Sequence, residues 1–343
     1  GQPAFYNTEA IVQELMEAGK TIEDARLGGT SGCVETGCFG KEAYVLTGYM
    51  NIPKILELTL NNGYDPISKK QIGIETGDPR NFKSYEELFE AFKKQLHYMI
   101  DIKIEGNAVI ENICAKHMPC PLMSTIVDDC IEKGKDYQRG GARYNTRYIQ
   151  GVGIGTITDS LTAIKYNVFD KKKFDMDTLL KALDANFEGY EAILNLVSNK
   201  TPKYGNDDDY ADEIMQEIFN AYYNEVTGRP TVCGGEYRVD MLPTTCHIYF
   251  GEIMGASPNG RLCAKPVSEG ISPEKGGDTN GPTAVIKSCA KMDHIKTGGT
   301  LLNQRFAPSV VQGEKGLDNM ANLVRAYFNM DGHHIQFNVF DKN

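Results

Sequence analysis

The stretch GGTSGCVETGCFGKEAY, residues 28–44, places five glycines, two cysteines and two glutamates in one short segment. So many glycines disfavour a regular helix or strand, so the segment predicts a shaped loop. Cys33 and Glu35 are two positions apart. In an extended backbone, residues at this spacing project to the same side. The stretch therefore predicts a loop that presents a thiol and a carboxylate to one ligand.

Composition narrows the class of protein. The chain has 343 residues, of which 41% are apolar, which is enough to bury a large core in one large domain or two. The net charge of −10 argues against a nucleic acid or an acidic membrane as partner. Nine scattered cysteines, an odd number, indicate reduced thiols and hence a cytoplasmic protein. We expect neither a membrane span nor a secretory leader.

Both ends of the sequence indicate a segment cut from a longer protein. The chain begins at Gly1, without an approach to its first element, and it stops at Asn343, just after the strand-like run GHHIQFNV. We therefore expect a segment that is truncated at both ends.

Helices and strands are expected to alternate, which favours an α/β fold with parallel pairing. A helix is expected from Asn7 or Thr8 to about Gly19, and another after Ser84, where Glu87 completes a capping box. Further helices are expected near 53–62, 158–168, 175–198, 207–227, 283–291 and 314–330. Strand-like runs are PAFYN (3–7), TTCHIYF (244–250), TLLNQRF (300–306) and HHIQFNV (333–339). The plausible internal boundary lies at 256–282, and the parts on either side of it are expected to pack together.

Three other motifs favour structural roles. GVGIGT at 151–156 lacks the spacing of a nucleotide-binding loop, so it indicates close backbone packing. His333 and His334 would point to opposite faces of a strand, which favours core positions over a shared metal. A third motif has a spacing compatible with a zinc site and consists of Cys114, His117, Cys120 and Cys130. A tight cysteine pair is missing from it, so buried thiols fit better. We therefore expect no metal.

Cys33 and Glu35 then remain as the candidate catalytic pair. A nucleophilic cysteine needs a histidine base beside it, and this loop has none. A neighbouring carboxylate instead suits a cysteine that removes a hydrogen atom while Glu35 handles a proton. Cys38, five positions further on, is expected to be a packing thiol.

The sequence Gly32-Cys33-Val34-Glu35 resembles the cysteine loop of the glycyl radical enzymes, the pyruvate formate-lyase-like family, whose eliminating members read G-C-V-E there. Three further segments are similar to family segments and follow in the same order: GGARYN (140–145), SPNGRLCAKPVSEGISP (257–273, with Asn259 in place of the usual aspartate) and GHHIQFNV (332–339). The continuation TGCFGKEAYVLTGYMNIPKILELTLNNG, residues 36–63, is similar to the branch of the family that dehydrates hydroxyproline.

The resemblance implies a fold, namely the C-terminal part of a ten-stranded α/β barrel made of two five-stranded halves. It implies that residues 1–260 belong to the barrel domain and carry the cysteine loop, and that 261–343 begin the glycyl-radical domain. The family's radical glycine lies in an R-V-x-G-Y motif, whereas this chain has only RVDML at 238–242. The radical glycine is therefore expected beyond Asn343, and the segment alone is expected to be inactive.

The resemblance also implies a mechanism. No bound organic cofactor is expected; an activating enzyme that uses S-adenosylmethionine and an iron–sulfur cluster installs a backbone glycyl radical under anaerobic conditions. That radical oxidises Cys33 to a thiyl, which attacks hydroxyproline, while Glu35 assists loss of water to give pyrroline-5-carboxylate. Tyr49 and Thr244 are expected to line the substrate pocket, with ordinary core positions as the alternative. A homodimer is one expected assembly.

Two other readings stay open. One is a different glycyl radical elimination, of a diol, an aminoalcohol or a sulfonate. The other is a non-catalytic, thiol-rich binding protein, which would form no radical.

Overall fold

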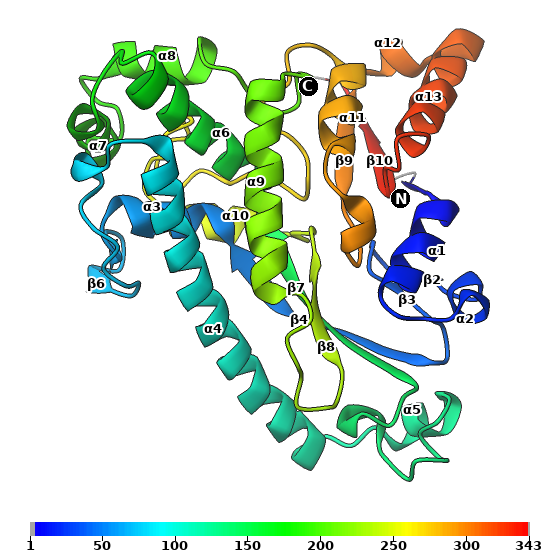
Figure 1. Ribbon diagram of the computed structural model, residues 1–343. Helices are drawn as coiled ribbons and strands as arrows, with labels where there is room; N and C mark the ends of the chain where they lie inside the picture. Colours follow the sequence, from blue (N-terminus) through cyan, green and yellow to red (C-terminus); the bar gives the residue numbers. More distant parts are fainter. Residues whose placement is uncertain (1–3, 342–343) are drawn as a thin grey trace.

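The computed structural model describes residues 4–341, and parallel strands form its framework (Figure 1). β4 (Glu42–Asn51), β7 (Tyr144–Val152) and β8 (Glu236–Asp240) pair in that order, and β9 (Leu302–Phe306) pairs with β10 (His334–Val339). A parallel bridge between Met241 and Thr300 joins the two groups. Within the described residues, the order β4-β7-β8-β9-β10 is thus the expected five-stranded half of an α/β barrel. β1 (Ala4–Tyr6) adds to β10 in antiparallel orientation.

Helices and short hairpins fill the connections between these strands. Two-stranded hairpins are β2 (Gly29–Thr30) with β3 (Thr36–Gly37), and β5 (Tyr64–Asp65) with β6 (Lys70–Gln71). The helices are α1 (Thr8–Glu17), α2 (Ile22–Arg26), α3 (Ile52–Leu60), α4 (Tyr85–His117), α5 (Pro121–Ile126), α6 (Ile154–Ile164, continued by a π-helical turn, Lys165–Asp170), α7 (Met176–Asp184), α8 (Glu191–Asn199), α9 (Asp209–Val226), α10 (Cys246–Glu252), α11 (Pro282–Ala290), α12 (Pro308–Val311) and α13 (Gly313–Phe328). Among residues 4–341, no helix is both long and apolar enough to cross a membrane.

The helix starts follow the capping residues that the sequence predicts. The Asn7 side chain accepts a hydrogen bond from Ala10 N at 3.4 Å, and Ser84 Oγ accepts one from Glu87 N at 3.3 Å. Asp208, at the start of the helix expected near 207–227, also caps α9 by accepting a hydrogen bond from Tyr210 N. These caps satisfy backbone N–H groups that have no partner inside the helix, which is why the helices begin there.

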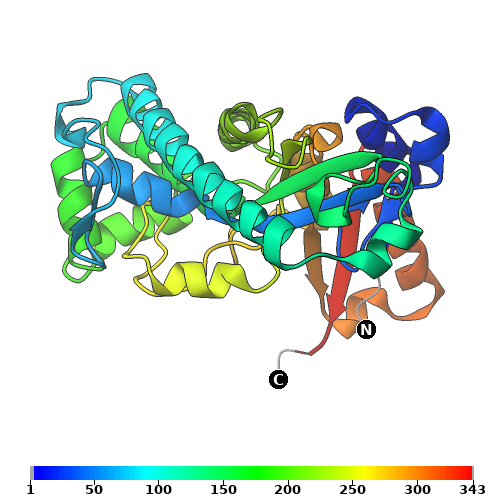
Figure 2. The same ribbon diagram turned by 90° about the horizontal axis from the view of Figure 1, so that it is seen from below.

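The two faces of the sheet differ in chemistry. Ile149 and Val239 point toward α4 and α9 and belong to the main apolar core. Because side chains alternate along a strand, their neighbours Tyr148, Gln150 and Asp240 point to the other face. Figure 2 shows α9 and α10 on opposite sides of β4 and β7. The outer face is therefore an apolar packing surface, and the inner face is polar and faces the hairpin of β2 and β3.

A β-bulge in β4 sets which residues face inward. Leu46 pairs with Tyr148 and Tyr49 pairs with Gln150, so two residues of β4, Thr47 and Gly48, stand opposite one of β7. Lys103 and Asn107 of α4 hold the bulge: Lys103 Nζ donates to Thr47 O at 2.8 Å, and Asn107 Nδ2 donates to Thr47 Oγ1 at 3.0 Å. A bulge redirects the side chains that follow it. This one places Tyr49 level with Gln150.

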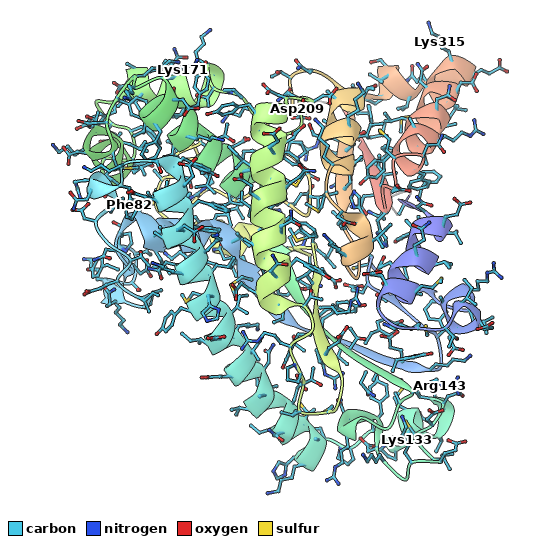
Figure 3. All side chains as sticks on the ribbon, in the orientation of Figure 1. Phe82, Lys133, Arg143, Lys171, Asp209 and Lys315 are labelled. Carbon is cyan, nitrogen blue, oxygen red and sulfur yellow. The ribbon has the colours of Figure 1, made fainter. Side chains whose placement is uncertain are left out.

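Long connections are fixed to the framework by polar contacts. Arg143, labelled at the lower right of Figure 3, binds the Asp24, Asp128 and Asp129 carboxylates at 3.1–3.3 Å and so ties the start of β7 to α2. Residues 253–281 contain no helix or strand, yet Ser268 N donates to Thr156 Oγ1 of α6 at 2.8 Å. The parallel bridge between Met241 and Thr300 joins the parts on either side of this segment, which pack together as expected.

The glycines of GVGIGT serve close packing, as the sequence indicates. A Cβ on Gly151 would lie 2.8 Å from Met241 Sδ, and one on Gly155 would lie 2.8 Å from Ser272 O. Both distances are below van der Waals contact. At Gly155 the neighbouring atoms belong to the backbone and cannot move aside, so only glycine fits there, whereas at Gly151 the neighbouring side chains would have to shift.

Two expectations about local structure are wrong. The run TTCHIYF at 244–250 is not a strand: Pro243 ends the extended segment, because it has no N–H to donate to a sheet, and α10 follows from Cys246. The expected helix over 175–198 is two helices, because Asn186, Phe187 and Gly189 between them all have positive φ. In the first case, a backbone turn overrides the strand preference of the side chains. In the second, a turn interrupts the helical spacing of the apolar residues.

We predict that Gly48→Ala lowers stability. Gly48 has φ +118°, and a Cβ there would lie 2.4 Å from Lys103 Nζ. The strained backbone should reduce the free energy of unfolding by about 1–3 kcal/mol, measured as the urea midpoint of the full-length protein. Gly106→Ala is the matched control, because nothing lies within 4 Å of its Cβ position in α4. This control should be stabilising by roughly 0.5–1 kcal/mol. Equal destabilisation by both variants would contradict the account of the bulge.

Candidate active site

The cysteine hairpin consists of β2, β3 and the tip between them, residues 31–35. Thr30 pairs with Thr36, and Ser31 N donates to Glu35 O at 2.8 Å, which closes the tip. Cys33 is exposed, whereas Glu35 is 3% exposed. Residues 32–34 form bends, so the expectation of an extended backbone here is wrong. The tip nevertheless carries one accessible thiol and one buried carboxylate.

Thr36 anchors this hairpin to three other parts of the chain. Its N–H donates to Gly298 O at 2.9 Å, and its carbonyl accepts from Tyr148 Oη at 3.1 Å. Its hydroxyl donates to the Glu14 carboxylate. Because Thr36 directly follows Glu35 in the chain, these contacts also fix the position of the Glu35 backbone.

Two glycines let the chain before β9 reach the hairpin. A Cβ on Gly298 would lie 1.9 Å from the Tyr148 ring, and one on Gly299 would lie 2.3 Å from Val34 O. Gly299 also has φ +141°. Sequence reasoning did not select this pair. The available signal was the dipeptide itself, which stands directly before the strand-like run at 300–306.

Glu35 is held by two hydrogen-bond donors. Ser31 Oγ donates to its Oε2, and Gln150 Nε2 donates to its Oε1 at 3.4 Å. Sequence reasoning missed both donors. Ser31 lies inside the quoted loop, whereas Gln150 comes from a strand more than a hundred residues away and is identified only by the fold. The two donors orient the Glu35 carboxyl group.

Cys33 is arranged as a thiol. Its carbonyl accepts a hydrogen bond from Tyr6 Oη at 2.5 Å, which ties the tip to β1. Partial burial and the charge of Glu35 raise the pKa of the Cys33 thiol above its ordinary value. At neutral pH the sulfur therefore keeps its hydrogen. This is the form that can give up a hydrogen atom, and not the form that attacks as a nucleophile.

Tyr49 and Thr244 meet near the hairpin. Tyr49 Oη lies 2.9 Å from Thr244 Oγ1. Burial raises the pKa of Tyr49, and the charges of Cys246, Glu35 and Cys33 add to this effect. Tyr49 is the register partner of Gln150, whose side chain binds Glu35 of the hairpin. The structure thus brings together Tyr49 and Thr244, which the sequence assigns to one pocket.

Thr244 has a strained backbone. Its φ is +49°, in the left-handed region, which a β-branched residue rarely adopts. Such outliers persist where surrounding structure enforces them, and they cluster at ligand sites. The strain at Thr244 therefore supports a binding role for its exposed hydroxyl.

The other candidate groups lie elsewhere. Cys38 is buried among Ile11, Leu15 and Ala25, and burial raises its pKa to about 11, which suits a packing thiol. Across residues 4–341, no group of three or more His, Cys, Asp and Glu side chains is placed to hold a metal ion. His333 and His334 are both buried, and burial lowers the pKa of each to about 3, so both are neutral.

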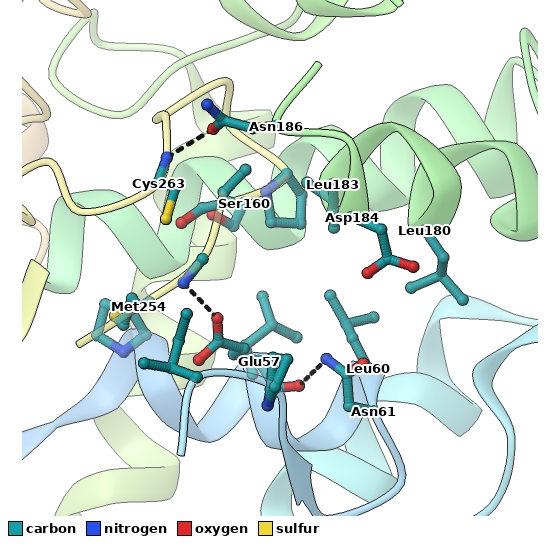
Figure 4. A pocket seen from close by; sticks show the side chains of 18 residues that line it. Glu57, Leu60, Asn61, Ser160, Leu180, Leu183, Asp184, Asn186, Met254 and Cys263 are labelled. Carbon is teal, nitrogen blue, oxygen red and sulfur yellow. Dashed lines mark hydrogen bonds between the residues drawn. The ribbon is translucent and has the colours of Figure 1, made fainter. Parts of the chain in front are cut away.

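A separate cavity of about 270 Å³ lies between α3, α7 and the segment after α10 (Figure 4). Glu57, Asn61 and Asp184 supply polar groups to its wall, and Glu57 Oε1 accepts from Gly255 N at 2.7 Å. None of the candidate catalytic side chains lines this cavity. It is therefore distinct from the site at the cysteine hairpin.

We predict that Cys33 reacts slowly with iodoacetamide at neutral pH, because only the thiolate is alkylated and its pKa is raised. Alkylation, followed by mass spectrometry in the full-length protein, should accelerate only as the pH rises past the ordinary thiol range. Glu35→Gln should accelerate it at any given pH, since the neighbouring negative charge is removed. Glu188→Gln, an exposed change between α7 and α8, is the control. Faster alkylation of wild type than of Glu35→Gln would contradict this electrostatic account.

Comparisons with known proteins agree with this architecture. Residues 1–251 match the Pyruvate formate lyase-like family, and residues 267–343 match the Glycine radical family. The (2S)-3-sulfopropanediol dehydratase of Klebsiella oxytoca is 35% identical, over 99% of this chain and 42% of that protein. The isethionate sulfite-lyase of Desulfovibrio desulfuricans is 33% identical, over 100% of this chain and 42% of that protein.

Two solved structures superimpose closely on the chain. The glycerol-bound, B12-independent glycerol dehydratase from Clostridium butyricum gives a TM-score of 0.95 at 41% identity, over 99% of this chain and 43% of that one. A Roseburia inulinivorans structure of 1,2-propanediol dehydration gives 0.96 at 38% identity, over 99% of this chain and 44% of that one. The chain therefore spans less than half the length of these relatives. It belongs to the pyruvate formate lyase-like family of glycyl radical enzymes.

Proposed function

We propose that the full-length protein is a glycyl radical dehydratase that removes water from trans-4-hydroxy-L-proline and yields pyrroline-5-carboxylate. The observation that carries this proposal is the hairpin tip, where an accessible Cys33 thiol stands two residues from the buried Glu35 carboxylate. The relatives named above are dehydratases and lyases, which supports an elimination reaction.

The choice of substrate rests on the sequence that follows the hairpin tip. Glycerol- and choline-type members of the family usually have a proline after G-C-V-E, whereas this chain has Thr36. Residues 36–63 resemble trans-4-hydroxy-L-proline dehydratase. In the structure these residues form β3, the bulged β4 and α3, so they include Tyr49.

The residues of this chain fit the glycyl radical that the family uses. Cys33 is accessible, and its raised thiol pKa keeps the S–H hydrogen in place, so it has a hydrogen atom that a radical can remove. When present, the glycyl radical supplies the ability to remove the hydrogen atom of the Cys33 thiol. We assign its installation to an activating enzyme that uses S-adenosylmethionine and an iron–sulfur cluster. We also propose that residues 1–260 belong to the barrel domain and 261–343 to the start of the radical domain.

The reaction then balances as follows. The Cys33 thiyl takes a hydrogen atom from C5 of the substrate, leaving an unpaired electron beside the ring nitrogen. The C4–O bond breaks with its electron pair, and the ring nitrogen loses its proton, so that a C5=N double bond remains. Glu35 takes this proton and passes it to the departing hydroxide, which leaves as water, so Glu35 ends in its starting state. The unpaired electron, now at C4, takes the hydrogen atom back from Cys33.

The polar residues around the tip have defined tasks in this scheme. Ser31 and Gln150 orient Glu35 for the proton transfer. The Tyr49 and Thr244 hydroxyls, 2.9 Å apart, offer hydrogen bonds to polar groups of the substrate. Holding reacting groups at the correct distance is itself a large part of catalysis.

A second candidate function is diol dehydration, which the glycerol and 1,2-propanediol relatives favour. The two functions are separated by incubating the activated full-length enzyme with hydroxyproline, glycerol and 1,2-propanediol in parallel. Pyrroline-5-carboxylate from hydroxyproline supports the proposed substrate. Turnover of the diols alone would exclude it.

We predict that Cys33→Ser abolishes turnover while the glycyl radical still forms in the activated full-length enzyme. An alkoxyl radical on serine is far harder to form than a thiyl, so the chain of hydrogen transfers stops. Electron paramagnetic resonance measures the radical, and product assays measure turnover. Cys38→Ala is the control and should keep most activity, because Cys38 is a packing thiol. Wild-type turnover by Cys33→Ser would remove this residue from the mechanism.

We predict that Glu35→Gln separates hydrogen-atom transfer from proton transfer. Glutamine keeps the size of the side chain but cannot release a proton at neutral pH. Dehydration should fall by roughly 10²–10⁴-fold, the usual contribution of a general acid or base. Cys33 should still exchange hydrogen with the substrate.

The measurement uses the activated variant and hydroxyproline in deuterated water. A substrate radical that cannot eliminate persists, so the Cys33 S–H formed from the C5 hydrogen has time to exchange with solvent before it is returned. Recovered substrate should contain deuterium although little product forms. The Cys33→Ser variant is the control, and its recovered substrate should contain none. Undiminished dehydration by Glu35→Gln would show that another group handles the proton.

A further inference from the structure

A second buried carboxyl group, Asp240, lies on the inner face of the sheet beside Gln150, which binds Glu35. Asp240 is the last residue of β8 and is 0% exposed. Among the described residues, neither of its carboxyl oxygens has a hydrogen-bond partner. A buried carboxyl group without partners is costly, and more so when it is ionised. The reaction scheme above does not use this group.

Gln150 connects Asp240 to Glu35. It is the register partner of Asp240 across β7 and β8, and of Tyr49 across β4 and β7, so the three side chains point to the same face at one level. Gln150 Nε2 donates to Glu35 Oε1 at 3.4 Å. Its Oε1 is buried, and within residues 4–341 it has no donor. Among the described residues, Asp240 and Gln150 on adjacent strands therefore each have buried acceptor oxygens without a hydrogen-bond donor.

A single proton on Asp240 would give both Asp240 and Gln150 Oε1 a hydrogen-bond partner. If Asp240 is a carboxylic acid, its O–H can donate to Gln150 Oε1, and the amide is then held with its NH₂ group toward Glu35. If Asp240 were ionised, the amide would turn its NH₂ group toward Asp240. Its carbonyl oxygen would then face the Glu35 carboxylate, where acceptor meets acceptor. The protonation of Asp240 therefore decides which end of Gln150 faces Glu35.

We propose that Asp240 is a neutral carboxylic acid that donates a hydrogen bond to Gln150 Oε1, and that the two residues position Glu35 for proton transfer. This inference rests on the proposed function only in giving Glu35 its proton-transfer role. Asp240 and Gln150 are positioning residues, since they act through Glu35 and do not touch the reacting atoms.

The charges that face Asp240 favour the neutral form. Burial raises the pKa of Asp240 well above its ordinary value, the charges of Glu35 and Glu14 raise it further, and Arg238 of the same strand opposes them. The Arg238 guanidinium forms an ion pair with Glu236 at 3.5 Å, and no ion pair of it with Asp240 is present among the described residues. The Tyr148 and Tyr222 hydroxyls are also buried nearby, and their pKa values are raised in part by Asp240.

The kinetic test compares two substitutions at one position in the activated full-length enzyme, with rates expressed per radical. Asp240→Ala removes the donor and should lower kcat by roughly 10- to 100-fold, the scale of one buried hydrogen bond lost from a positioning network, with little change in KM. Asp240→Asn supplies an NH₂ donor of the same shape and should restore kcat to within about threefold of wild type. Asp212→Asn, an equally buried change in α9 without a link to Glu35, controls for stability effects.

Gln150→Leu and the double variant with Asp240→Ala test whether the two residues act as a unit. Each single change should lower kcat by a similar factor, and the double variant should be no slower than either single one. Multiplying factors in the double variant would show independent roles and would overturn the positioning pair.

A substrate-free measurement checks the protonation state directly. The infrared difference spectrum of full-length wild type against Asp240→Asn at neutral pH should contain the carbonyl stretch of a protonated carboxyl group, shifted in deuterated water. Absence of that band, together with an Asp240→Asn rate as low as that of Asp240→Ala, would overturn the inference. If wild type does not dehydrate hydroxyproline, the proposed function fails while the infrared result still decides the state of Asp240.

Discussion

The hydrogen bonds of Thr36 determine where the cysteine hairpin lies on the inner face of the sheet. Its partners come from α1, from β7 and from the glycine pair before β9. Glu14, Tyr148 and Gly298 are far apart in the chain, so the site exists only when the helix and both groups of strands have assembled. The thiol and the carboxylate occupy a short tip on this fixed base, which limits their freedom before any substrate binds.

The polar inner face must hold several carboxyl groups close together. Burial raises the pKa values of Glu14 and Asp240, so both favour the neutral form. A group whose pKa is higher in the folded protein stabilises it fully below the ordinary carboxyl range of about 4. That stabilisation is lost as the pH rises through the folded value. Keeping these two acids neutral reduces the number of like charges packed beside Glu35, whose carboxyl oxygens accept hydrogen bonds from Ser31 and Gln150.

The helices and the identity of the cysteine loop could be predicted from the sequence, because both depend on local patterns. Asn7, Ser84 and Asp208 mark helix starts by side-chain chemistry alone. The strands β4, β7 and β8 were not predicted. Arg147 and Arg238, buried in β7 and β8, are charged residues that interrupt the apolar run typical of a central strand.

The candidate site was predictable only in part for the same reason. Cys33 and Glu35 are neighbours in sequence, whereas Gln150 and Asp240 reach Glu35 through strand register, which no local pattern encodes. The positive φ of Thr244 depends on how the chain leaves β8 for α10, and residue preferences alone indicate a strand there.

In the proposed reaction, Cys33 takes a hydrogen atom from C5 and returns it to C4. Hydroxyproline carrying two deuterium atoms at C5 tests this claim in the activated full-length enzyme in ordinary water, with the product reduced at once to proline and analysed by NMR. The account predicts that one deuterium remains at C5 and that the other is found at C4. Complete loss of the second deuterium to solvent, with hydrogen from water at C4, would indicate a polar elimination and contradict the account.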